Sequence, residues 1–416
     1  MVNHPRDIQV DIHRLRADIE SLGRIGRDPR GGLSRPSFSP GDREARAWLR
    51  DKIEKAGLRY HQDGAGNIFG RLGEGGPVVL AGSHIDTVIN GGQFDGAAGV
   101  LAGLECLRRI REERLQLARP VGVVSFTDEE GNLVGDFLGS RAFTGRLDPR
   151  EVEGGLTASG RPLRDVLEGT GLSVVTILRA HAERPAVDAY LELHIEQGPT
   201  LEAAGTPIGI VDRIAGKSYR LCSYIGKAEH GGTTPIERRR DAFLAAADFA
   251  LRGTRLVVSR HRDGLMTIGR VSLSPGAFSV VPGQADFSLD IRSASADTLR
   301  GMGSELLELA GEVAAERDVS FRSRLADETE PVRLPEKLLA LFEEECDALG
   351  YPRLRLASGA GHDAQIMSSI TEAGLIFIPC AGGVSHAPDE TVDWEDLEKG
   401  ANLLLRSLIR SASRGS

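Results

Sequence analysis

Several features are absent from this 416-residue sequence, and each absence excludes a class of protein. No apolar run reaches the roughly 18 residues that a membrane-spanning helix requires. The first 20 residues carry charges throughout and lack the apolar centre of a signal peptide. The four cysteines are widely scattered and form no C-x-x-C pair, so neither a disulfide framework nor a zinc knuckle is predicted. We therefore expect a cytoplasmic protein without a membrane partner.

A concentrated basic surface is also missing. The formal net charge is −9, and lysine and arginine are interspersed with acidic residues along most of the chain. The short basic run IERRRDA at residues 236–242 is diluted by acids and is best explained as the solvated start of a helix. Nucleic-acid binding normally needs a basic patch, so no nucleic-acid partner is predicted. With 40% apolar and 27% charged residues, the chain has a globular composition and sufficient length for two domains.

The order of the expected elements predicts an α/β domain into which a second domain is inserted. Strand-like segments alternate with amphipathic helices, which predicts a sheet with helices on both faces. The strands are expected at 67–71, 78–83, 121–127, 189–194, 208–213 and 375–379, and the helices at 7–22, 39–57, 96–113, 336–348 and from 394 onward.

The middle of the chain shows a different pattern. The segments KSYRLCSYIGK and ADFSLDIRSAS alternate apolar and polar residues, as strands do that face water on one side. With helix candidates at 240–251 and 296–317, they predict an α+β domain, an antiparallel sheet with two helices on one face. We therefore place the catalytic domain at 1–213 and 328–416 and the inserted domain at 214–327.

Five short segments carry reactive side chains, and each lies at the end of an expected strand or in the loop after it. Open α/β sheets gather their ligand sites at this edge. The segments are GSHIDT (82–87), GGQFDG (91–96), FTDEEGN (126–132), ELHIEQG (192–198) and GGVSHAP (382–388), and together they supply His84, Asp95, Glu129, Glu130, His194 and His386. A single histidine after a strand is more often a packing residue, and an acidic pair is usually solvated. Five such segments in one chain favour a metal site.

A pair of metal ions needs a bridging carboxylate, further ligands on each side and a base for the catalytic water. Asp95 is placed to bridge the ions, and His84 could bind one of them. Asp86, on the same strand, could orient the His84 ring. The adjacent Glu129 and Glu130 point in different directions, so one can bind metal while the other faces the water. The surrounding glycines let the loop bend closely around an ion.

These segments resemble the hydantoinase/carbamoylase branch of the M20 metallopeptidase family. The resemblance extends from about residue 40 onward and includes GSRAFTG (139–145), GKAEHGGTTPIERRRDA (226–242), VPGQADFSLDIR (281–292), GAGHDAQ (359–365) and GVSHAPDE (383–390). That branch holds N-carbamoyl-L-amino-acid hydrolases, β-ureidopropionases, allantoate amidohydrolases and ureidoglycolate amidohydrolases. The resemblance implies a zinc-peptidase-like catalytic domain, and it makes the inserted domain a lid that also carries a homodimer contact.

The resemblance also implies a role for each residue of the metal site. It assigns His84 and His194 to one ion, Glu130 and His386 to the other, Asp95 to the bridge and Glu129 to the general base. Two divalent ions are expected, with zinc as the first choice and manganese, cobalt or nickel as alternatives that suit the same ligands.

Further residues are assigned to the substrate by the same resemblance. His230 would reach the partner subunit's active site and stabilise the oxyanion, and Arg292 would bind the substrate carboxylate bidentately. Gln197 and His362 would line the side that recognises the amide.

One predicted ligand indicates which bond is cleaved, and two differences from the family pattern bear on the substrate. Peptidases on this scaffold usually have a carboxylate where this chain has His194, and histidine there is typical of the amidohydrolase branch. Ser279 stands before VVPG where the branch commonly has asparagine, and EEGNLVGDF replaces the common EEGxRF, with Asn132 and Leu133 after the base. Both departures predict a bulkier or differently charged substrate.

The sequence thus predicts an amidohydrolase that cleaves the carbamoyl or ureido C–N bond of an N-carbamoyl amino acid or a related ureido acid. An aminoacylase or dipeptidase on the same scaffold is the alternative. A catalytically silent metalloprotein that binds a small ligand is a remote one, because its sequence mark would be the loss of Glu129 or His386, and both are present.

Overall fold

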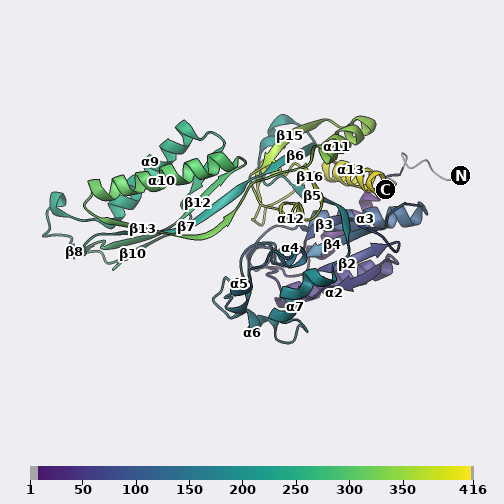
Figure 1. The fold of residues 1–416 in the computed structure, drawn as a ribbon, viewed down its shortest axis with the longest axis horizontal. Helices are drawn as coiled ribbons and strands as arrows, with labels where there is room; N and C mark the ends of the chain where they lie inside the picture. Colours follow the sequence, from purple (N-terminus) through teal and green to yellow (C-terminus); the bar gives the residue numbers. More distant parts are fainter. Residues whose placement is uncertain (1–7, 414–416) are drawn as a thin grey trace. The chain divides into compact units, whose positions relative to one another are not determined.

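The computed structural model describes residues 8–413, which fall into two units (Figure 1). Unit 1 comprises the described residues up to Asp212, together with Leu334–Leu356 and those from His362 onward. Unit 2 comprises Arg213–Arg333 and Ala357–Gly361. Between residues 8 and 413 no helix combines the length and apolarity that crossing a membrane demands.

Most strands of a nine-stranded mixed sheet form the centre of unit 1, while its edge strand Val332–Arg333 lies within unit 2. The strands of this sheet follow the order β1-β2-β4-β3-β5-β16-β6-β14, and β15 also pairs with β6. They are β1 (Arg59–Gln62), β2 (Ile68–Leu72), β3 (Val78–His84), β4 (Val121–Phe126), β5 (Val187–Ile195), β6 (Ile208–Ile214), β14 (Val332–Arg333), β15 (Arg353–Ser358) and β16 (Glu372–Ile378). The central strands β4, β3, β5 and β16 run parallel, so their carboxyl ends lie at one edge.

Helices cover both faces of these central strands. On one face α3 (Ala97–Glu112) packs against β3, β4 and β5, and α13 (Trp394–Ser413) packs against α3 and β5. Leu193 of β5 points to this face, where it contacts Gly400 of α13. Glu192, one residue earlier, points the other way and accepts a hydrogen bond from the Ala364 N–H of α12 (Asp363–Met367). Glu192, and His194 two residues later, therefore lie on the face of β5 that α12 covers.

The remaining helices of unit 1 are mostly short. They are α1 (Ile12–Leu22), α2 (Pro40–Lys55), α4 (Leu138–Thr144), α5 (Pro149–Glu153), α6 (Leu163–Leu167), α7 (Val174–Arg179), α8 (Thr200–Ala204) and α11 (Glu336–Leu349), with 3-10 turns at Ala180–Glu183 and Ala381–Gly383. A separate apolar cluster holds α4 to α7 together, and it includes Leu133, Leu138, Val152, Leu163 and Ile177.

Unit 2 is an antiparallel sheet with two long helices on one face. Its five-stranded sheet has the order β10-β12-β7-β13, with β9 also paired to β12. The elements are β7 (Gly216–Ile225), β9 (Gly264–Thr267), β10 (Val271–Ser274), β12 (Gln284–Ser293), β13 (Ser320–Thr329), α9 (Ala242–Arg260), α10 (Ala296–Glu316), the short pair β8 (Glu229–His230) and β11 (Val280–Val281), and a 3-10 turn at Ile236–Arg238. Tyr224, Phe249 and Phe287 fill the core between sheet and helices.

The predicted fold class is confirmed, and a few element predictions were wrong. The helix predicted to end at Leu251 continues to Arg260, because Gly253 and Val257 extend its buried face. The strand β1 and the short helices α5 to α7 were not predicted. The expected helix at 7–22 begins at Ile12, and its first residue lies outside the described part of the chain.

Candidate metal centre

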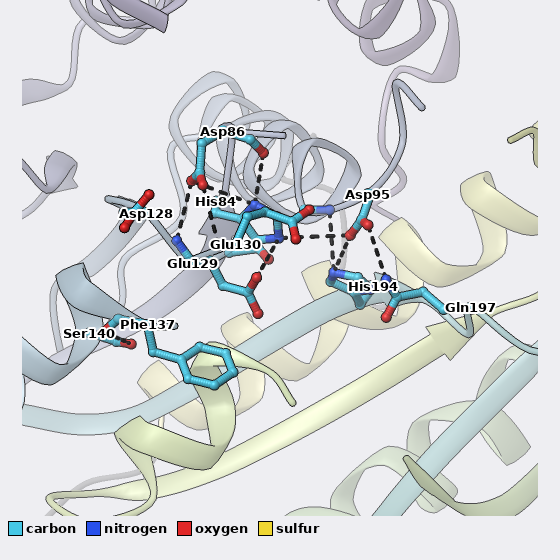
Figure 2. A network of polar contacts seen from close by, with 12 residues as sticks. His84, Asp86, Asp95, Asp128, Glu129, Glu130, Phe137, Ser140, His194 and Gln197 are labelled. Atoms are coloured by element: carbon cyan, nitrogen blue, oxygen red, sulfur yellow. Dashed lines mark hydrogen bonds and ion pairs between the residues drawn. The ribbon is translucent and has the colours of Figure 1, made fainter. Parts of the chain in front are cut away.

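The predicted ligands come together at the carboxyl edge of the parallel strands. Figure 2 shows four of them, His84, Asp95, Glu130 and His194. His84 ends β3, and His194 is the next-to-last residue of β5. Glu129 and Glu130 follow β4, and Asp95 lies just before α3. His386 lies in the loop after β16, and it is the only one of the six that is half-exposed. The edge therefore gathers side chains that are far apart in sequence.

Asp95 occupies the centre of this group. Its Oδ1 lies 3.1 Å from His194 Nε2, and its Oδ2 lies 3.1 Å from His386 Nε2. His84 Nε2 is 3.7 Å from Asp95 Oδ1, and Glu130 Oε2 is 3.6 Å from His386 Nε2. Among the described residues, four groups of side chains could hold a metal ion, and one of them is His84, Glu129 and Glu130. Two other groups contain Asp95, namely His84, Asp95 and His194, and Asp95, Glu130 and His386. These two groups share Asp95, each through a different oxygen.

Backbone carbonyls orient two of the imidazole rings. His84 Nδ1 lies 3.1 Å from the Asp86 carbonyl oxygen, and His194 Nδ1 lies 2.9 Å from the Ile195 carbonyl oxygen. A proton on each Nδ1 satisfies these contacts, and Nε2 is then the ring nitrogen that faces Asp95. The sequence assigned this orienting role to Asp86. Its Oδ1 is 3.7 Å from His84 Nδ1 and accepts the N–H of Glu129, while its Oδ2 accepts the N–H of Glu130, both at 3.4 Å.

Burial sets the protonation of the carboxylates. Burial raises the pKa of Glu129 well above its usual range, and the neighbouring Glu130 and Asp363 raise it further. Burial likewise raises the pKa of Glu130, with a contribution from Asp95. It raises the pKa of Asp86 to about 7. Charged carboxylates this close together in a buried site require compensating positive charge.

The pKa values of His84 and His194 are shifted in opposite directions. Burial lowers the pKa of His84 to about 4, which keeps its ring neutral. Burial also acts against the charged form of His194, but the hydrogen bond to Asp95 outweighs this and raises its pKa to about 9. For Asp95, burial opposes ionisation, while hydrogen bonds from His194 and His386 hold its pKa well below the usual range. Cation binding would displace the His194 proton, as metal binding to histidine generally does.

This donor set fits two divalent cations. It offers imidazole nitrogens and carboxylate oxygens in the mixture that zinc, manganese, cobalt and nickel accept. The positive charge of the cations would also meet the need that the buried carboxylates create.

Gly96 is required where it stands. Its φ of 62° and ψ of −48° lie outside the regions open to other residues. A Cβ atom there would lie 2.4 Å from Cδ2 and Nε2 of His84. The glycine-rich loop therefore serves to bring the backbone against the His84 ring, which agrees with the reason inferred from sequence. Gln197 and His386 also adopt positive φ angles, 57° and 56°, although neither is glycine.

Comparisons with known proteins identify the family to which the chain belongs. The sequence pattern of peptidase family M20/M25/M40 matches residues 80–410. The chain belongs to this family. It is 37% identical to an N-carbamoyl-L-amino acid amidohydrolase from Geobacillus stearothermophilus over 96% of this chain and 98% of that protein. It is 33% identical to an allantoate amidohydrolase from Escherichia coli strain K12, over 94% and 96% of the two chains.

A solved structure supports the same relationship. The crystal structure of an amidase of the hydantoinase/carbamoylase family from Burkholderia multivorans superposes with a TM-score of 0.88 at 30% identity, covering 98% of this chain and 100% of that one. The M20 resemblance expected from the motifs is thereby confirmed.

Two of the predicted substrate residues lie beside the potential metal ligands of this M20 protein. Gln197 Nε2 donates to Asp95 Oδ2 at 3.0 Å and to Ser385 Oγ at 3.2 Å. His362 is buried at the start of α12, with its ring 4.6 Å from that of His194. With Glu192 and His194 it forms another of the four groups of potential ligands. Both residues thus contact ligands directly.

The other predicted substrate residues lie in unit 2. Arg292 on β12 places its Nε 3.1 Å from both carboxylate oxygens of Asp290, and its Nη2 donates to the Tyr219 hydroxyl at 2.8 Å. His230 on β8 is exposed, and its Nδ1 accepts the Gly232 N–H at 3.0 Å. The carbonyl of Ser279 accepts the Gly231 N–H at 2.6 Å, so Ser279 lies next to His230.

One sequence departure has a structural explanation. Leu133 is buried in the apolar cluster of the short helices, where it packs with residues such as Leu138 and Val152. The Leu133 side chain therefore anchors the loop after Glu129 and Glu130 to that cluster.

The structure adds residues to which the sequence assigned no role. Glu390 and Ser385 both contact the Asp95 loop or its carboxylate, and Glu192 accepts a hydrogen bond from Ser83 next to His84. Glu390 and Ser385 belong to the motif GVSHAPDE, so the signal was present in the sequence, but only the fold shows what they contact.

Proposed function

We propose that the chain is a dinuclear metal-dependent amidohydrolase that cleaves the carbamoyl or ureido C–N bond of an N-carbamoyl amino acid or related ureido acid. The position of Asp95 carries this proposal, because each of its oxygens lies 3.1 Å from a different histidine. A carboxylate in this arrangement is what a bridged metal pair requires. The names of the relatives support the choice of bond, since they act on N-carbamoyl amino acids and on allantoate.

In this proposal His84, Asp95 and His194 hold one divalent ion, and Asp95, Glu130 and His386 hold the other. Zinc is the first choice, with manganese, cobalt and nickel as alternatives. Bound there, the ions would polarise the scissile carbonyl and lower the pKa of the attacking water.

Glu129 is the proposed general base. Its carboxylate is almost buried, and its Oε2 lies 3.7 Å from His84 Nε2, so it faces the centre of the cluster. Burial raises its pKa, and so do Glu130 and Asp363. A carboxylate with a raised pKa holds a proton well enough to take it from water and deliver it to the departing nitrogen. A carbamate product would then decompose to ammonia and carbon dioxide.

His230 and Arg292 are the proposed contacts to the substrate. Because His230 Nδ1 accepts a backbone N–H, the proton of the neutral ring must lie on Nε2. The exposed edge of the ring is then a hydrogen-bond donor, which suits an oxyanion. Asp290 fixes the Arg292 guanidinium, whose side chain stays 31% exposed and can meet a substrate carboxylate. Gln197 and His362 would recognise the amide, and Ser279 would shape the carboxylate end.

We further propose that unit 2 is a lid and forms a homodimer that brings His230 to the partner's site. Of the twelve large apolar side chains that are exposed among the described residues, nine lie in unit 2. Leu244, Leu251 and Val258 recur every seven residues on α9, which gives an apolar stripe along one helix face. Such a stripe is typical of a surface that a second copy covers. A cytoplasmic location, expected from the sequence, belongs to the same proposal.

Ammonia release tests the proposed bond. Metal-reconstituted protein is assayed with N-carbamoyl-L-amino acids, N-carbamoyl-β-alanine, allantoate, ureidoglycolate and N-acetyl amino acids, with Glu129→Gln as the control. Ammonia from a ureido compound, lost in the variant, supports the proposal and identifies the substrate. Free amine from the acyl compounds alone would indicate an aminoacylase on the same scaffold.

A further inference from the structure

A buried carboxylate outside the ligand set connects two loops of the candidate metal centre. Glu390 lies in the loop before α13 and is only 4% exposed. Its Oε1 accepts the backbone N–H of Phe94 at 2.8 Å and that of Asp95 at 3.0 Å. Its Oε2 accepts the hydroxyl of Ser385 at 3.0 Å. One side chain thus holds the backbone of the bridging residue and the residue next to His386.

Ser385 extends this connection to the Asp95 side chain. Its Oγ lies 3.2 Å from Asp95 Oδ2 and also accepts the amide of Gln197. A hydroxyl has one proton to donate, so Ser385 can satisfy either Asp95 or Glu390 at a given moment. The two carboxylates are therefore coupled through a single proton donor.

The packing around Glu390 supports a specific role for its carboxylate. A Cβ atom at Gly92 would lie 2.2 Å from Cδ and Oε1 of Glu390. The backbone of the loop that carries Asp95 therefore lies directly against this carboxylate. His386, four residues before Glu390, adopts a φ of 56°, a conformation that its surroundings must hold in place.

We propose that Glu390 is a positioning residue that fixes Asp95 and His386 in the geometry needed to share metal between them. The proposal rests on the metal centre of the proposed function and adds to it a residue that binds neither metal nor substrate. Removing the carboxylate leaves two buried N–H groups without an acceptor and frees the loop of His386.

Metal titration of two Glu390 variants, alongside a control variant, tests this role. In Glu390→Ala, the affinity for the ion that Asp95, Glu130 and His386 would hold should fall about 10- to 100-fold. A loss of this size is typical when a partner of a metal ligand is removed. In Glu390→Gln, the amide oxygen can still accept both N–H groups and the amide nitrogen can donate to Ser385, so metal affinity should stay close to that of the unmodified protein. Zn²⁺ and Mn²⁺ are titrated into metal-free protein against a chromophoric chelator, and melting temperatures are recorded in parallel.

Glu345→Ala is the matched control for lost stability. Glu345 is also a buried carboxylate, but its partners are Arg406 and Arg410. This variant should melt at a lower temperature and keep its metal affinity. If Glu390→Ala loses stability as Glu345→Ala does but binds both ions normally, the proposal is wrong. Should Glu390→Ala fail to fold, Ser385→Ala takes its place, and unchanged affinity for both ions in that variant overturns the proposal.

The titration needs no substrate, which separates this inference from the proposed activity. If Glu390→Ala weakens metal binding but the unmodified protein releases no ammonia, the role of Glu390 stands and the proposed reaction fails. If ammonia is released and Glu390→Ala binds metal normally, the reaction stands and the role of Glu390 fails.

Discussion

Replacing Gly96 with alanine should displace the His84 ring and disable the metal centre. A Cβ atom at position 96 would lie 2.4 Å from two ring atoms of His84. Ordinary contacts between carbon atoms begin at about 3.5 Å, so the ring must retreat by roughly 1 Å. The φ of 62° adds a conformational cost of about 1–3 kcal/mol for a residue with a side chain.

The expected loss of activity follows from this displacement. A shift of about 1 Å in a catalytic group typically lowers the rate about 100-fold. In Gly96→Ala we therefore expect kcat to fall by at least that factor and one metal ion to bind weakly. Metal content and steady-state rates with the best ureido substrate measure both effects.

Gly103→Ala on the same helix is the matched control. Its Cβ atom would approach Val123 and Ala81 at 3.2 and 3.3 Å, a mild crowding that small shifts relieve. This variant should bind metal and turn over substrate almost as the unmodified protein does. A Gly96→Ala protein that binds two ions and keeps its full kcat would refute the reasoning.

Three further predictions follow from the proposed site. Removing metal with a chelator should lower the melting temperature by several degrees, because a ligand at a thousandfold excess over its Kd stabilises by about 4 kcal/mol; a thermal scan that shows no change would contradict it. Mixing Glu129→Gln with His230→Ala should restore about a quarter of the activity of the unmodified protein, since half of the dimers are mixed and each mixed dimer has one complete site. No recovery after subunit exchange would argue against an active site that takes His230 from the partner subunit. Arg292→Lys should raise KM about tenfold with a smaller change in kcat, because lysine cannot bind a carboxylate bidentately; an unchanged KM would remove Arg292 from the substrate site.

The sequence predicted those parts of the fold in which burial follows a regular pattern. All seven residues of β3 are buried, as its continuous apolar run indicated. The alternation in ADFSLDIRSAS appears in β12, where buried and partly exposed side chains alternate along the whole strand. By contrast, the helices α4 to α7 have five to seven residues each, which is too short to show a period. Contacts with distant residues, such as Phe38, fix that region.

The sequence predicted which residue types form the candidate site, but it predicted few of the contacts between them. Histidine and carboxylate at strand ends suffice to suggest a metal centre. The carbonyl of Asp86 contacts the His84 ring, and no sequence pattern indicates this because every residue has a carbonyl group. The contact from Glu390 to Asp95 depends on two loops almost 300 residues apart, and only the folded sheet brings them together.

The most direct test of the account is to locate the metal ions by anomalous X-ray scattering from crystals of the metal-loaded protein. A dinuclear centre should give two peaks, one between His84, Asp95 and His194 and one between Asp95, Glu130 and His386. A single peak, or peaks that do not both contact Asp95, would contradict a dinuclear centre bridged by this residue.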